Sequence, residues 1–136
     1  MTNTGNKIEQ GKLLGGGPGD VPIVHTLYHT YREWSEMLMK FPKVQRYTLG
    51  EIISQNLLTS LELLLGAASM SNPAEKLTRL FAVSAKIDLL KLLIRLSKDT
   101  KCLPNEKYLK LESLLIDAGK MLGGWIKNLE QHKGAQ

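Results

Sequence analysis

Hydrophobic residues recur every three or four positions through most of the chain between residues 22 and 130, which is the pattern of amphipathic helices. Prolines at positions 22, 42, 73 and 104 divide this stretch. Because proline is accepted in the first turn of a helix but not in its interior, each should mark a helix start or a connection. The pattern therefore predicts four helices, over about 23–40, 49–69, 73–97 and 105–129.

Two of the predicted helix starts carry capping signals. Thr48 and Glu51 have the spacing of a capping box, in which each side chain bonds a free backbone N–H of the other residue. Tyr47 and Ile52 would flank this box as a hydrophobic staple. Asn72, followed directly by a proline, predicts a second capped start.

The predicted connections are short, and short connections join antiparallel neighbours. We therefore expect an all-α fold, an up-down-up-down antiparallel four-helix bundle over residues 22–130. The helices over 49–69 and 73–97 are apolar around most of their circumference, which is more than a lone bundle has to bury. A homo-oligomer with these two helices at its interface accounts for the excess. A flattened monomeric bundle with a wider shared core is the alternative.

The two ends of the chain have a different character. Half of the 12 glycines lie within residues 1–21, so this segment is expected to be a flexible Gly-rich tail, with residues 131–136 as a short C-terminal tail. The first residues show no apolar segment of a secretion signal, and no stretch has the composition of a membrane span. With Cys102 as the only cysteine, no internal disulfide is possible. We expect a cytoplasmic protein without membrane contact.

Positive charge is expected at one end of the bundle. The chain has 18 Lys and Arg against 13 Asp and Glu, a net charge of +5. In this topology the first and third connections lie at the same end, so the basic residues near them should gather there. These candidate nucleic-acid contacts are Lys40, Lys43, Arg46, Arg95, Lys98, Lys101, Lys107 and Lys110. Such a cluster suits a phosphate backbone, with binding that weakens as salt rises.

Some of these residues have a second explanation. Cations near a helix C-terminus are favoured by the helix dipole, which is an alternative reason for Arg95 and Lys98. Phe41, Tyr47 and Tyr108 lie close by in sequence and could stack unpaired bases. For Phe41 and Tyr47, a place in the core and in the staple is the preferred interpretation.

The sequence offers no catalytic constellation. His25 and His29 are one helical turn apart, which suits zinc, but neither a glutamate between them nor a third ligand accompanies them. The Gly-rich segment lacks the sequence of a phosphate-binding loop, and Cys102 has no histidine nearby. We therefore expect no enzyme, no metal and no cofactor.

Three glycines inside the last predicted helix need a structural reason. Each of Gly119, Gly123 and Gly124 costs ~1 kcal/mol relative to alanine in a helix. The close approach of another helix is the expected compensation.

Two sequence segments resemble known proteins. The sequence FPKVQRYTLG over 41–50 resembles a segment of small bacterial four-helix-bundle proteins of the ribosomal-RNA intervening-sequence type. The sequence LGGWI over 122–126 is similar to the accessory variability determinant (Avd) proteins of diversity-generating retroelements, a branch of the same superfamily. The resemblance covers about residues 22–130 and favours the Avd branch.

The resemblance implies a pentameric, barrel-like assembly that binds the reverse transcriptase of the retroelement and its template RNA. It also implies a role in mutagenic cDNA synthesis without catalysis by the subunit itself. Lys43 and Arg46 match the basic loop of the family and become the first candidates for contact with the polymerase, RNA or RNA–cDNA. A structural interaction protein of the intervening-sequence type, with no catalytic partner, stays open as the alternative.

Overall fold

The computed structural model describes residues 13, 15, 17 and 21–135, and the expected tail over 1–21 lies almost wholly outside them. The chain forms α2 (Pro22–Leu38), α3 (Lys43–Arg46), α4 (Leu49–Ser69), α5 (Pro73–Asp99) and α6 (Asn105–Ala135). No strand occurs among the described residues. The all-α fold expected from the sequence is confirmed.

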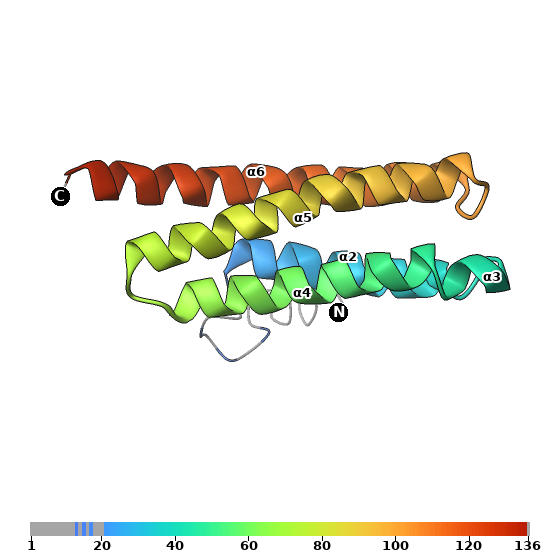
Figure 1. Ribbon diagram of the computed structural model, residues 1–136, viewed down its shortest axis with the longest axis horizontal. Coiled ribbons are helices and arrows are strands. Elements are labelled where there is room, and N and C mark those ends of the chain that lie inside the picture. Colours follow the sequence, from blue (N-terminus) through green and yellow to red (C-terminus); the bar gives the residue numbers. More distant parts are fainter. Residues whose placement is uncertain (1–12, 14, 16, 18–20, 136) are drawn as a thin grey trace, which may run out of the picture.

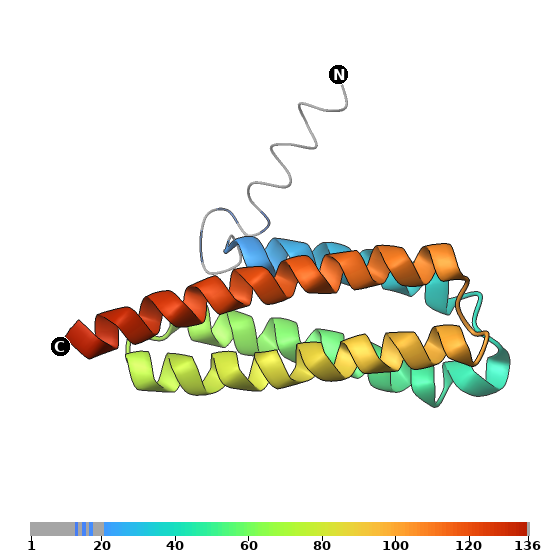
Figure 2. The ribbon, with the colours of Figure 1, turned by 90° about the horizontal axis from the view of Figure 1, so that it is seen from above.

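The four long helices form an antiparallel up-down-up-down bundle (Figure 1). Helix α2 packs against α4 and α6, and α5 packs against the same two helices from the other side. The connection from α2 to α4, which contains α3, lies at the same end as the connection from α5 to α6 (Figure 2). The connection from α4 to α5 lies at the opposite end. The bundle therefore has one end where the first and third connections meet, which we call the basic end.

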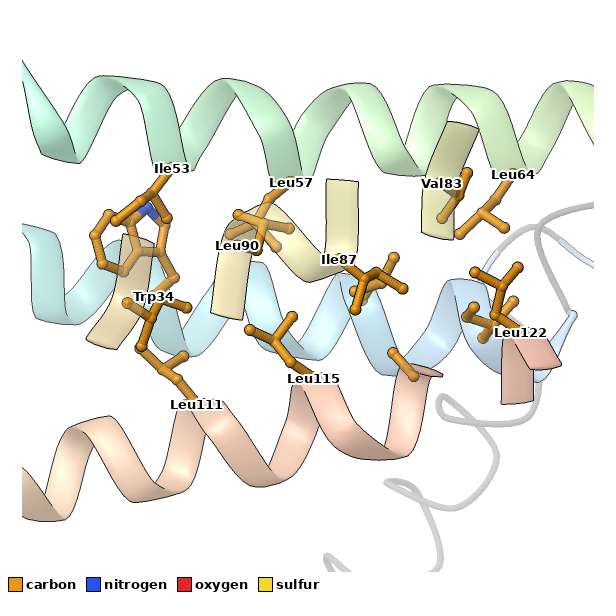
Figure 3. Close-up of a cluster of buried hydrophobic side chains, with 14 of the residues drawn as sticks. Trp34, Ile53, Leu57, Leu64, Val83, Ile87, Leu90, Leu111, Leu115 and Leu122 are labelled. Carbon is orange, nitrogen blue, oxygen red and sulfur yellow. The ribbon is translucent and has the colours of Figure 1, made fainter. Parts of the chain in front are cut away.

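The centre of the bundle is filled by large side chains that point inward from all four long helices (Figure 3). Trp34 is fully buried among them, and its indole Nε1 donates a hydrogen bond to Ser54 Oγ at 2.9 Å. The Phe41 ring meets the Trp34 ring edge-on, with centroids 5.2 Å apart. Phe41 is thus a core residue, as preferred from the sequence, and is not exposed to stack on bases.

Helix α5 starts as expected. The Asn72 side-chain oxygen accepts hydrogen bonds from the backbone N–H groups of Ala74 and Glu75, at 2.9 and 3.2 Å. This is an N-cap, followed by Pro73 in the first helical position.

Helix α4 starts differently from the expectation, and the predicted capping box is wrong. No side chain caps this helix, and the Thr48 hydroxyl instead donates to Gln45 Oε1 at 3.0 Å. The short helix α3, which the sequence pattern did not reveal, brings Gln45 close to Thr48 and so supplies a competing partner. Tyr47 and Ile52, the expected staple, are 65% and 50% exposed.

Helix α6 continues beyond its expected end near residue 129. It runs to Ala135, so residues 131–135 are helical instead of forming a separate tail. No proline or glycine interrupts residues 129–133, which gives the helix no reason to stop earlier.

The glycines of α6 have no close neighbour, so the expected helix approach is wrong for them within this chain. A Cβ added to Gly119 would lie 3.8 Å from the nearest atom, and at Gly123 and Gly124 it would meet nothing within 4 Å. A close approach occurs instead at Gly50, where an added Cβ would lie 2.5 Å from Leu38 Cδ1. The sequence places glycines in a helix but does not show which face packs.

None of the described helices combines enough length with a sufficiently apolar composition to cross a bilayer.

Candidate nucleic-acid interface

The two connections bring the predicted basic residues together, as the topology required (Figure 2). Lys40, Lys43 and Arg46 lie in or beside the first connection. Lys98, Lys101 and Lys107 lie in or beside the third. Arg95 in α5 and Lys110 in α6 lie about one turn farther from this connection. The gathering of these residues at one end is therefore confirmed.

A hollow of about 1060 Å³ lies at the basic end. Four of the candidate residues line it: Lys40, Lys98, Lys101 and Lys107. Its lining also includes the buried side chains of Met37 and Leu103, together with Glu33, Glu36 and Glu106. The arrangement can hold a ligand that offers negative charge on one side and an apolar face on the other.

The lysines of the hollow share its lining with three glutamates but form no ion pair with them. Among the described residues, no ion pair involves Lys40, Lys98, Lys101 or Lys107. Lys107 attracts the Glu33 carboxylate from a longer distance and helps to lower its pKa. The Lys98 ammonium lies 4.9 Å from the ring centroid of Tyr108, a cation–π contact that fixes its position without neutralising it. These four amines are free to meet anionic groups.

Two other candidates are paired with carboxylates. The Arg95 guanidinium lies 3.2 Å from Asp99 one turn later, and hydrogen bonds to Tyr108 and Asp99 raise the pKa of Arg95. Lys110 Nζ lies 2.9 Å from Glu33 Oε2, and this hydrogen bond lowers the pKa of Glu33. Because both cations face a carboxylate, they contribute less to the field of the basic end than the lysines of the hollow.

Arg46 holds the backbone that follows α2 in place. Its Nη2 group donates to the backbone carbonyl of Met39 at 3.0 Å and to that of Phe41 at 3.4 Å. These carbonyls follow the end of α2, where the helix leaves such groups without internal partners. Arg46 therefore ties α3 to the end of α2, whereas Lys43 in the same short helix is exposed.

Of the predicted stacking residues, only Tyr47 is exposed. Tyr108 is buried, with only 7% of its surface exposed. Its hydroxyl donates to the Glu112 carboxylate, and this hydrogen bond raises the pKa of Tyr108. Tyr47 is 65% exposed beside α3.

The turn after α5 contains a backbone feature that the sequence pattern did not predict. Lys101 has a positive φ of 64°, the only such non-glycine residue described. The N–H groups of Lys101 and Cys102 donate to the carbonyls of Lys98 and Ser97, at 2.9 and 2.8 Å. This is a Schellman motif, which closes a helix and is usually made with glycine at the position of Lys101. A lysine there puts positive charge directly at the lip of the hollow.

No histidine lines the hollow, but His29 lies next to Glu33, which does. His29 Nε2 is 3.7 Å from Glu33 Oε1, which makes it a neighbour of a carboxylate one turn along α2. The described residues contain no group of three or more side chains placed to hold a metal ion.

Comparison with known families decides the classification. A family model described as bAvd-like matches residues 24–129, a range that includes most of every long helix. The chain belongs to the bAvd-like family. No curated protein and no solved structure matches it. The range matched to the bAvd-like family contains all of the basic residues described above, and the Avd resemblance inferred from the two sequence segments is confirmed.

Proposed function

We propose that this bAvd-like chain is a nonenzymatic accessory subunit of a diversity-generating retroelement. It binds the reverse transcriptase and the template RNA through its basic end and supports mutagenic cDNA synthesis. Family membership supports the retroelement context. The observation that carries the proposal for RNA is the convergence of four lysines on one hollow, none of them in an ion pair among the described residues: Lys40, Lys98, Lys101 and Lys107.

The charge distribution favours a polyanion over a small ligand. The four amines come from two connections that are far apart in sequence, and Lys43 adds a further exposed charge beside them. An extended phosphate backbone can meet several such charges in succession and release its counterions, which strengthens binding at low salt.

The second part of the proposal is a homo-oligomer, for which the Avd resemblance implies a pentameric barrel. Helix α5 exposes a stripe of large apolar side chains, Phe81, Leu89, Leu92 and Leu96, which are 51%, 40%, 64% and 45% exposed. At 100° per residue they fall within roughly 80° of the helix circumference, and they extend over roughly 22 Å of its length. A continuous apolar stripe of this kind is the usual mark of a protein–protein contact.

Charge reversal tests the RNA contact. The double variant Lys40→Glu/Lys101→Glu changes two exposed lysines of the hollow. Lys120→Glu/Lys127→Glu, on the exposed side of α6, is a control with the same change in net charge. In fluorescence anisotropy with template-region RNA, we expect the first variant to bind at least about tenfold more weakly, since two phosphate contacts are replaced by repulsion. The control should stay close to the unaltered protein, and equal losses in both would reject the site.

Co-purification tests the polymerase partner. A reverse transcriptase encoded beside this chain should be retained by it, both with and without ribonuclease if the contact is direct. Retention only without ribonuclease would mean that RNA bridges the two proteins. A purified pair that never associates would favour the alternative, an interaction protein of the intervening-sequence type.

A further inference from the structure

We infer that the hollow at the basic end accepts unpaired nucleotides of a single-stranded RNA segment and not an RNA duplex. The inference rests on the proposed function and specifies which form of RNA the same site takes. It is carried by three kinds of side chain that line one cavity: lysines, apolar groups and carboxylates.

The size of the hollow limits its occupant. Its volume of about 1060 Å³ is close to the upper end of small-molecule sites, which reach roughly 1,000 Å³. A cavity of this size holds a few nucleotides, whereas a double helix can only lie across its mouth. The lining would then be contacted only by nucleotides that leave a helix.

The lining matches the parts of an unpaired nucleotide. The lysines offer ammonium groups to phosphates. Met37 and Leu103 form a buried apolar part of the wall, and Met39, which is 75% exposed, stands beside them. Thioether and aliphatic groups pack against the flat face of a base, which an A-form duplex keeps stacked inside its helix.

The carboxylates give the strongest reason to exclude a duplex. Glu33 is already bonded to Lys110, but Glu36 and Glu106 are exposed and form no ion pair among the described residues. A carboxylate only accepts hydrogen bonds, so it repels phosphate but binds the amino groups of bases. A duplex would bring its phosphates to these glutamates as well as to the lysines. A single strand can turn its phosphates toward the lysines and its base edges toward the glutamates.

The same chemistry predicts a base preference. Cytosine presents an amino group where uracil presents a carbonyl oxygen, and only the amino group can donate to a glutamate. Cytosine should therefore be preferred to uracil at the hollow. A glutamine in place of the glutamate can donate to the uracil oxygen, which should remove the preference.

The experiment compares four RNA probes by fluorescence anisotropy: a mixed-sequence single strand of roughly 12 nucleotides, its duplex, oligo(C) and oligo(U). We expect the single strand to bind more tightly than the duplex, and oligo(C) to bind about fivefold more tightly than oligo(U), the effect of one net hydrogen bond. In Glu36→Gln/Glu106→Gln, the difference between oligo(C) and oligo(U) should disappear and duplex binding should rise. The matched control Glu62→Gln/Glu75→Gln changes two exposed glutamates on other parts of the bundle and should keep the preference.

The outcomes separate this inference from the proposed function. If Lys40→Glu/Lys101→Glu weakens binding to every probe while duplex and single strand bind equally, the RNA site stands and the inference is wrong. If no RNA binds at all, both fail. If the same variant loses the polymerase but keeps RNA, the hollow docks a protein, and the inference is also wrong.

Discussion

Lys110 on α6 and Glu33 on α2 form an ion pair of 2.9 Å across two helices that are distant in sequence. The Lys110 hydrogen bond holds the pKa of Glu33 below its ordinary value of 4.5. A lowered carboxyl pKa stabilises the fold above the ordinary value, and this contribution is lost as the pH falls through the lowered value.

Glu33→Gln should therefore destabilise the protein at neutral pH and have little effect below the pKa of Glu33. The Lys110 side chain is 49% exposed, so water screens the pair and the expected loss is only about 0.5 kcal/mol. Urea unfolding at neutral pH and at successively lower pH measures how the difference between the two proteins falls as Glu33 becomes protonated. Glu36→Gln, one turn further along α2, is the control, and a pH-independent effect of Glu33→Gln would contradict the pairing.

Ser54→Ala should cost about 1–3 kcal/mol of unfolding free energy, because it leaves the buried Trp34 indole N–H without its acceptor. Ser113→Ala, at an exposed position of α6, should change stability little. Thermal or urea unfolding followed by circular dichroism compares the two. Equal stability of both variants would show that the hydrogen bond is unimportant.

Lys101→Gly should stabilise the fold by about 1 kcal/mol, since glycine adopts the positive φ of this position without steric cost. Lys98→Gly, inside the last turn of α5, should instead destabilise it by up to about 1 kcal/mol. Both variants remove one lysine from the hollow and should weaken RNA binding. Opposite effects on stability with similar effects on binding would separate the backbone role of Lys101 from its charge.

Arg46→Ala should lower the unfolding free energy by about 1.5–3 kcal/mol, because its guanidinium bonds two backbone carbonyls after α2. Lys43→Ala, at an exposed position of the same short helix, should leave stability unchanged. Calorimetry of both variants tests this assignment. An Arg46→Ala protein as stable as the unaltered protein would contradict this structural role of Arg46.

Leu92→Glu should dissociate the proposed oligomer, since this side chain is 64% exposed in the middle of the apolar stripe of α5 and is not needed for the core. Val44→Glu, at a position 78% exposed in α3, is the control. Light scattering after size exclusion gives the mass of each variant. A single monomeric species for the unaltered protein would reject the oligomer.

The long helices could be predicted from the sequence because their periodicity and prolines are local signals. The cap at Asn72 depends only on its neighbours in the chain, and it is present. The start of α4 could not be predicted, because a competing acceptor on Gln45 decides the direction of the Thr48 hydroxyl. That competition depends on α3, whose short length leaves no periodic pattern.

The candidate site could be predicted as a group but not residue by residue. Bundle topology alone brings the first and third connections to one end. Which cations stay unpaired depends on contacts between helices, such as Glu33 with Lys110, and on the fold of the first connection, where Arg46 turns back to backbone carbonyls. The hollow and the positive φ of Lys101 are likewise properties of the packed chain.

The most direct test of the RNA proposal is the salt dependence of binding for Lys40→Gln/Lys101→Gln compared with the unaltered protein. If these two lysines contact phosphates of single-stranded RNA, the slope of log affinity against log salt should become shallower by about 1.4, or roughly 0.7 for each lost contact. Parallel lines for the two proteins would contradict the account, because they would mean that the lysines of the hollow release no counterions when RNA binds.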